Sequence, residues 1–182
     1  MTDREIFSLW QVGQQEKAFG EIVDNYSERL YWHVRRLVCS HEDADDLLQD
    51  IFVKIWKSLH TFRGESQLFT WLYRIATNET LNFLHKQKIR ASHRFASITP
   101  ELEDKIEDDP YFNGDALQRA LLKAVRRLPD KQRTVFTMRY YDDLSYEEIA
   151  KILGTSVGAL KASYHFAAKK IRAELQKSAS CG

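Results

Sequence analysis

Two groups of side chains in the first half of the chain have the types and spacing of binding surfaces. The first lies between positions 42 and 50, which hold five acidic residues and no Lys or Arg. At helical spacing, one side of this stretch carries Asp46, Gln49, Asp50 and Val53. An apolar valine among acids indicates a surface for a basic partner. A solvated helix face, whose early acids favour the helix dipole, explains the same charges, and both interpretations stay open.

The second group follows a break at 61–66, where Gly and Ser interrupt the periodicity and predict a loop. After it, helical spacing places on one face Trp71, Arg74, Asn78 and His85. An aromatic ring, a cation and an amide on one exposed ridge can stack on unpaired bases and read their edges. Residues 85–94 add four Lys or Arg and no acid, which suits a phosphate backbone as well as the helix dipole. Aromatic residues on helices more often belong to a core, so the ridge alone is a weak signal.

The last third of the chain has the pattern of a second binding module. Ser145 and Glu148 have the spacing of a capping box, and Gly154 follows in a short turn, after which Thr155 is predicted to cap another helix. The outward positions of that helix are Lys161, Ala162, His165 and Lys169. Two helices joined by a Gly-containing turn predict a helix-turn-helix, whose second helix enters the major groove of DNA. A bare helical hairpin is the alternative.

The elements that must position these groups are all helical. Apolar residues recur every three or four positions over 3–12, 17–38, 42–59, 68–84, 115–127, 129–140, 145–153 and 155–172, and no convincing strand-like alternation occurs. Pro129 is expected in a first helical turn, and Leu117 on a buried face. The fold class predicted is all-α, with two small helical domains, an N-terminal helix bundle and a C-terminal helix-turn-helix domain, joined by an acidic linker.

The charge distribution supports the same division. The 182 residues are 43% apolar, enough for ordinary cores, and the net charge is +1. That value hides a partition: residues 1–90 carry 12 bases and 13 acids, residues 91–114 carry 2 and 6, and residues 115–182 carry 13 and 7. We therefore predict modules at 1–94 and 115–182, with different partners and with a linker at 95–114.

Several classes of function are not favoured. No apolar run is long enough to cross a membrane, and the start lacks a basic-then-apolar signal, so a cytoplasmic protein is predicted. Cys39 and Cys181 make no disulfide framework, and Cys39 is expected to be a small buried residue. Walker, Gly-x-Ser-x-Gly, Cys-x-x-Cys and Glu-x-x-His patterns are missing, and His33, Cys39 and His41 are too scattered for a metal motif. We predict no enzyme, no cofactor and no metal.

Read in order, three stretches closely resemble one family: Asp45 to Trp56, Phe62 to Gly64, and Thr70 to Asn78. They are similar to bacterial extracytoplasmic-function (ECF) sigma factors of the sigma-70 family, and the last third resembles the family's second domain. The resemblance implies a transcription initiation factor that binds core RNA polymerase, recognises minus-ten and minus-thirty-five promoter elements, and promotes strand opening. It also implies an anti-sigma partner, which can be membrane-bound. The missing apolar run predicts no membrane insertion by this chain.

The resemblance further implies roles for particular positions. Core-polymerase binding would fall to Asp46, Leu47, Gln49, Asp50, Phe52 and Val53. Minus-ten DNA binding would fall to Phe62, Arg63, Trp71, Arg74, Asn78, His85, Lys86 and Lys88, with the 62–70 loop receiving a flipped base. Minus-thirty-five binding would fall to Arg139, Ser156, Lys161, Ala162, His165, Phe166 and Lys169.

This chain departs from the family at two of the minus-thirty-five positions. Many members carry Ser where Ala162 stands and Arg where Phe166 stands. Apolar groups can contact thymine methyls but cannot read guanine, so the family's usual minus-thirty-five preference does not transfer. Two rival hypotheses are a helix-turn-helix regulator that acts without polymerase docking, and a helical adaptor whose acidic helix and basic domain bind two proteins.

Overall fold

The structure is a computed structural model that describes residues 1–93 and 114–180. Every regular element in these two ranges is helical, which confirms the predicted all-α class. The predicted linker at 95–114 lies, apart from Gly114, outside the described residues. We call residues 1–93 the N-terminal half and residues 114–180 the C-terminal half.

The N-terminal half contains α1 (Asp3–Gln11), α2 (Gln15–Val38), α3 (His41–Ser58), the short 3-10 helix η1 (Leu59–Thr61) and α4 (Leu68–His93). Local chemistry sets these ends: Thr2 and Glu5 form a capping box at α1, and the Ser40 side chain caps α3. Cys39, at φ 61°, ends α2 in the left-handed conformation and is half-buried, not buried as expected. The helix α4 extends beyond the predicted 68–84 and includes most of the basic stretch that follows position 84.

The C-terminal half contains α6 (Ala116–Arg126), α7 (Asp130–Phe136), the π-helical turn η2 (Thr137–Tyr141), α8 (Tyr146–Leu153) and α9 (Val157–Ser180). The predicted capping box of Ser145 and Glu148 begins α8, as expected. Pro129 is the N-cap of α7 and not part of its first turn. The cap of α9 is Ser156, whose hydroxyl accepts the N–H of Ala159 at 3.2 Å, so the prediction of Thr155 was one residue early.

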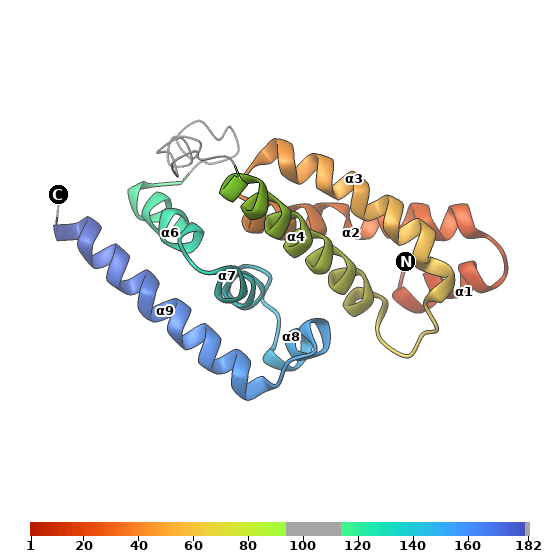
Figure 1. Ribbon diagram of the computed structural model, residues 1–182. Helices are drawn as coiled ribbons and strands as arrows, with labels where there is room; N and C mark the ends of the chain where they lie inside the picture. Colours follow the sequence, from red (N-terminus) through yellow and green to blue (C-terminus); the bar gives the residue numbers. More distant parts are fainter. Residues whose placement is uncertain (94–113, 181–182) are drawn as a thin grey trace.

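The helix α4 lies between the α1–α3 group and the C-terminal helices (Figure 1), packing against α2 and α3 on one side and α8 on the other. One continuous cluster of buried side chains joins the halves, because Met138, Leu144, Ile149 and Ile152 belong to the same cluster as Ile22, Leu30 and Leu72. A second cluster lies between α6, α7 and α9. Leu117, expected in a core, is 66% exposed on α6.

A buried polar network also crosses between the halves. His33 on α2 is fully buried, and its Nδ1 lies 2.7 Å from Asp142 Oδ2 while its Nε2 lies 3.0 Å from the Thr77 hydroxyl on α4. Arg36 donates to the other oxygen of Asp142 at 3.2 Å. The π-helical turn η2 leads directly into Asp142, whose N–H donates to Thr137 O. Buried charged groups need such partners, so this network fixes how η2 meets α2.

Candidate protein and nucleic-acid interfaces

The acidic side of α3 is exposed as predicted. Its exposed residues are Asp46, Gln49, Asp50 and Val53, and the Val53 side chain is 51% exposed. The opposite side of α3 holds Ile51 and Ile55 in the core. Leu47, for which the resemblance also implies polymerase binding, is 6% exposed because it points into that core. Exposed acids followed by an exposed apolar side chain on one side of a helix form a surface suited to a basic protein partner.

Sequence reasoning missed Trp56 as part of this surface. It lies one turn after Val53 and is 38% exposed, although its ring packs edge-on against Phe19 at 5.1 Å and Trp10 at 6.2 Å. Phe52 is half-buried beside Phe19. The i+3 spacing from Val53 was the signal that could have included Trp56. Together these side chains extend the acidic surface with a rigid aromatic edge.

Three of the four residues of the predicted ridge on α4 are exposed. Arg74, Asn78 and His85 are exposed, whereas Trp71 is half-buried with its ring 5.3 Å from that of Phe62. Phe62, expected to contact DNA, is only 8% exposed because Phe7 and Trp71 cover its ring. Phe62 is therefore largely covered by neighbouring rings in this structure.

Arg74 has a partner from the other half of the molecule. Its guanidinium donates to the backbone oxygen of Lys151 on α8 at 2.6 Å. In this conformation the guanidinium of Arg74, one residue of the ridge, is therefore hydrogen-bonded to the C-terminal half. Asn78, one turn further along α4, remains exposed.

The basic end of α4 is exposed along its length. His85, Lys86 and Lys88 all face solvent, as does Arg63 in the loop before α4. Lys88 forms an ion pair with Asp130 of α7, with Nζ 2.7 Å from Oδ2. The exposed cations form a surface that can follow a nucleic-acid backbone.

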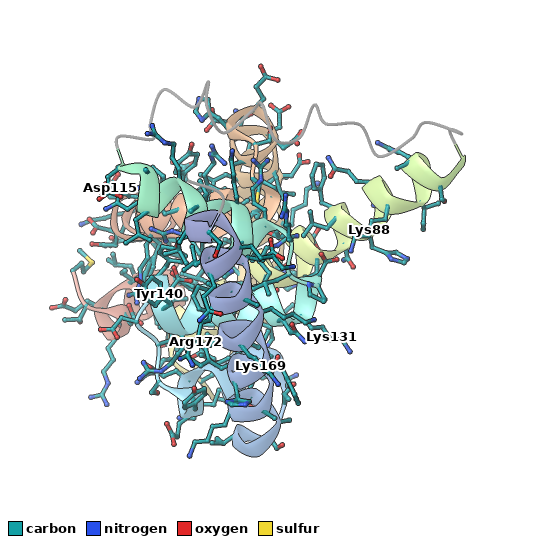
Figure 2. The ribbon with its side chains drawn as sticks, turned by 90° about the vertical axis from the view of Figure 1, so that its left-hand side faces the viewer. Lys88, Asp115, Lys131, Tyr140, Lys169 and Arg172 are labelled. Carbon is teal, nitrogen blue, oxygen red and sulfur yellow. The ribbon has the colours of Figure 1, made fainter. Side chains whose placement is uncertain are left out.

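The helix α9 presents the predicted outward face. Its exposed residues include Lys161, Ala162, His165, Phe166 and Lys169. Lys161 Nζ lies 5.9 Å from the centre of the Tyr146 ring, and Phe166 is 54% exposed. Figure 2 shows Lys169 and Arg172 along α9, with Lys131 of α7 on the same half of the molecule. A helix with cations and an apolar ring on its outer face suits a DNA major groove.

Two predicted residues of this module have structural roles here. Arg139 donates to the backbone oxygen of Leu144 at 3.2 Å and lies over the Tyr146 ring, which holds the turn before α8. Ser156 is engaged as the cap of α9. The turn between α8 and α9 contains Gly154 at φ +66°, as a helix-turn-helix requires.

Metal sites and membrane-spanning helices are not found among the described residues. Within residues 1–93 and 114–180 no cluster of His, Cys, Asp or Glu has the geometry of a metal site. Among these same residues, no helix is long and apolar enough to span a membrane. His33, one of the scattered candidate ligands, is engaged by Asp142 and Thr77 instead.

Comparison with known proteins places both halves in one class. Residues 22–90 match the family described as sigma-70 region 2, and residues 118–171 match sigma-70 region 4. The chain is therefore a sigma-70-type transcription initiation factor, and the helix-turn-helix regulator without polymerase docking is not favoured. It directs RNA polymerase to promoters.

Relatives and structures narrow the class further. The chain is 33% identical over 184 residues to the ECF RNA polymerase sigma-E factor of Escherichia coli, covering 97% of this chain and 95% of the relative. It is 30% identical to the sigma-E factor of Haemophilus influenzae, covering 97% and 96%. The chain belongs to the ECF sigma factors.

Two solved structures share its fold over most of their length. One is the sigma factor RpoE in complex with the anti-sigma factor NepR from Bartonella quintana, with a TM-score of 0.70 and 25% identity, covering 88% of this chain and 98% of that one. The other is CnrH in complex with the cytosolic domain of CnrY, with a TM-score of 0.69 and 25% identity, covering 96% and 97%.

Proposed function

We propose that three exposed surfaces divide the work of promoter recognition. The acidic side of α3 docks on core RNA polymerase, the ridge and basic end of α4 hold the separated non-template strand of the minus-ten element, and α9 enters the major groove of the minus-thirty-five element. One observation carries the proposal: three different helices around a shared core each expose residues of one surface. These residues are Asp50 and Val53 on α3, Asn78 on α4 and Lys161 on α9.

The α3 surface supports docking because its acids can attract a basic polymerase surface while Val53 and Trp56 supply apolar area for a stable contact. The residues proposed to act there are Asp46, Gln49, Asp50, Phe52 and Val53. Leu47, being buried, supports this surface from beneath.

The ridge on α4 supports strand separation because binding energy for single-stranded DNA shifts the equilibrium towards open DNA. Stacking a base on an aromatic ring contributes roughly 1–3 kcal/mol, comparable with the few kcal/mol needed to unstack one. The chain itself then performs no covalent chemistry, and the polymerase makes the RNA.

The proposal extends to domains, location and partners. We assign core binding and minus-ten recognition to residues 1–94, and minus-thirty-five recognition to residues 115–182. A polymerase partner implies action in the cytoplasm. Because structures similar to this chain were solved with anti-sigma factors, we also propose an anti-sigma partner for it.

The test is promoter opening by polymerase reconstituted with this chain, on a promoter found by transcribing a library of genomic fragments in vitro. Asn78→Ala should reduce permanganate reactivity of minus-ten thymines more than it reduces closed-complex binding. A template already mismatched across the minus-ten region should restore most of the loss, because its strands are separated beforehand.

The matched control is Asn25→Ala, the same change at an exposed position of α2 far from α4 in the sequence. It should leave opening unchanged. If Asn78→Ala causes equal defects on duplex and mismatched templates, the ridge does not act in strand opening. The same follows if the defect is confined to initial binding.

A further inference from the structure

The start of α1 and the loop before α4 line a cavity of about 450 Å³ that is open to solvent. Its walls include Asp3, Arg4 and Phe7 from α1, and Phe62, Gly64 and Ser66 from the loop. This volume lies within the range of about 300–1,000 Å³ typical of pockets for small ligands. The resemblance to the family implies no role for α1 in DNA recognition, yet three residues of α1 line this cavity.

The position of α1 at this wall is fixed by Asp3. One oxygen of its carboxylate accepts the N–H of Phe69, in the first turn of α4, at 3.3 Å, and the other accepts the hydroxyl of Tyr26. Burial and this hydrogen bond raise the pKa of Tyr26, so its hydroxyl stays a donor. The start of α1 is thereby tied to the start of the helix that carries the proposed DNA-binding ridge.

The ring of Phe7 sets the path of the loop. Gly64 has φ +74°, and a Cβ placed on it would lie 3.0 Å from Phe7 Cε1, so the loop backbone passes directly over the ring. Phe7 also packs edge-on against Phe62, with ring centres 5.1 Å apart. Phe7, Phe62 and Trp71 form a row of aromatic rings from the cavity to the ridge.

This wall carries one cation, Arg4, beside two carboxylates that keep their negative charge but are held by hydrogen bonds. The carboxylate of Asp3 is already engaged, and that of Glu5 accepts the backbone N–H and the hydroxyl of Thr2 at 2.7 and 2.8 Å. Those hydrogen bonds hold the pKa of Glu5 below its usual value and occupy the helix end. Arg4 is exposed, and it forms no ion pair with any of the described residues. Aromatic walls, polar loop groups and one guanidinium suit a nucleobase with its phosphate.

We propose that Arg4 and Phe7 of α1 bind the separated minus-ten strand. Phe7 forms the wall against which an extruded base of single-stranded DNA rests, and Arg4 binds the phosphate beside that base. This inference rests on the proposed function, because it requires that the 62–70 loop receives a base from the opened strand.

The test measures binding of a labelled single-stranded oligonucleotide, carrying the minus-ten element of the promoter found above, to the reconstituted holoenzyme. An abasic scan of the oligonucleotide first identifies the base whose loss weakens wild-type binding most. Phe7→Leu should weaken binding of the intact strand about tenfold, the scale of one stacked base, and should have little effect on the strand that lacks that base.

Arg4→Ala should weaken binding of the intact and the abasic strand to a similar extent. Its log-log salt slope should shrink by about 0.7, the value for one phosphate contact on single-stranded DNA. The matched controls are Arg119→Ala, at an exposed position of α6, and Phe83→Leu, at a half-buried position of α4. Both controls should bind like the wild type.

The outcomes separate this inference from the proposed function. If Asn78→Ala weakens binding while Arg4→Ala and Phe7→Leu match their controls, α1 has no role and the proposed function stands. If no abasic position weakens wild-type binding, both fail. Should Phe7→Leu lower the melting temperature strongly, Arg4→Ala still decides, since an exposed side chain without a partner can be removed without unfolding the protein.

Discussion

At the scale of single residues, His33 shows how burial changes the meaning of a side chain. From the sequence it was a scattered candidate ligand, yet the fold encloses it completely between Asp142 and Thr77. Asp142 is 109 positions away, and nothing in local spacing connects the two. A buried imidazole with two hydrogen-bond partners is a structural element, and removing a partner should cost stability.

We predict that Asp142→Asn lowers the free energy of unfolding by about 1–3 kcal/mol, because an amide replaces one of the two acceptors that face His33 and Arg36. Urea denaturation measures the change. The control is Asp143→Asn, the same substitution at the next position, whose side chain is 98% exposed. It should alter stability by less than about 0.5 kcal/mol. If the two substitutions lower the free energy of unfolding equally, the buried network does not contribute to stability.

We predict that Asp50→Arg weakens binding to core polymerase at least tenfold without unfolding the chain, because it reverses a charge on an exposed surface. Competition for core polymerase, together with a melting curve, measures both effects. Asp24→Arg, at an exposed position of α2, is the control and should bind normally. If Asp50→Arg and Asp46→Arg both bind like the wild type, the docking surface has been placed wrongly.

At the scale of elements, the capping box of α8 makes the helix-turn-helix sensitive to acid. The backbone N–H and hydroxyl of Ser145 donate to Glu148 at 2.8 and 2.9 Å, and these bonds hold the pKa of Glu148 below its usual value of 4.5. A carboxyl with a lowered folded-state pKa stabilises the fold above its unfolded pKa. That stabilisation is lost as the pH falls through the folded-state value.

We predict that Glu148→Gln destabilises the protein by roughly 0.5–1 kcal/mol at pH 7, a modest value because the site is partly exposed to solvent. The difference from wild type should shrink as the pH is lowered from 5 towards 3, where the wild-type carboxyl becomes protonated too. Denaturant unfolding at several pH values measures this. Glu147→Gln, one position earlier and outside the capping box, should show no such trend, and a constant difference for Glu148→Gln would contradict the prediction.

The helices themselves were predictable from the sequence, because their apolar residues recur at helical spacing and capping residues mark several ends. The α8 capping box and the exposed residues of α3 and α9 were confirmed in this way. The π-helical turn was not predictable, since Thr137 to Tyr141 continues the apolar pattern of α7. Leu117 was misjudged because the side of α6 that is buried depends on where α9 packs.

At the scale of the whole molecule, the two halves share a core although their sequences suggest separate modules. Side chains of η2 and α8 complete the cluster built by α1–α4. Lys88 with Asp130, and Arg126 with the backbone oxygen of Cys39, add polar contacts between the halves. Sequence periodicity reports which side of a helix is apolar, but it does not say which distant helix covers that side.

We predict that residues 1–94 and 115–182, expressed separately, each fold into helical domains that are less stable than the same segments in the intact chain. The loss should be at least about 2 kcal/mol, the contribution of one or two buried aliphatic side chains. Circular dichroism and denaturant unfolding of the two fragments and the whole protein measure it. If the intact chain unfolds in two steps that match the isolated fragments, the halves do not stabilise each other.

The hydrogen bond from Arg74 to the Lys151 backbone has a consequence for affinity. If Arg74 binds the separated strand as proposed, its guanidinium must first leave α8, and promoter binding then competes with this contact between the halves. The apparent dissociation constant then equals the intrinsic one divided by the fraction of molecules in which the halves have separated. If that separation costs about 2.8 kcal/mol, about one molecule in a hundred is competent, and the free protein binds promoter DNA about a hundredfold more weakly than its surfaces allow. Core polymerase, by binding the separated form, would recover that factor without adding a single contact to DNA.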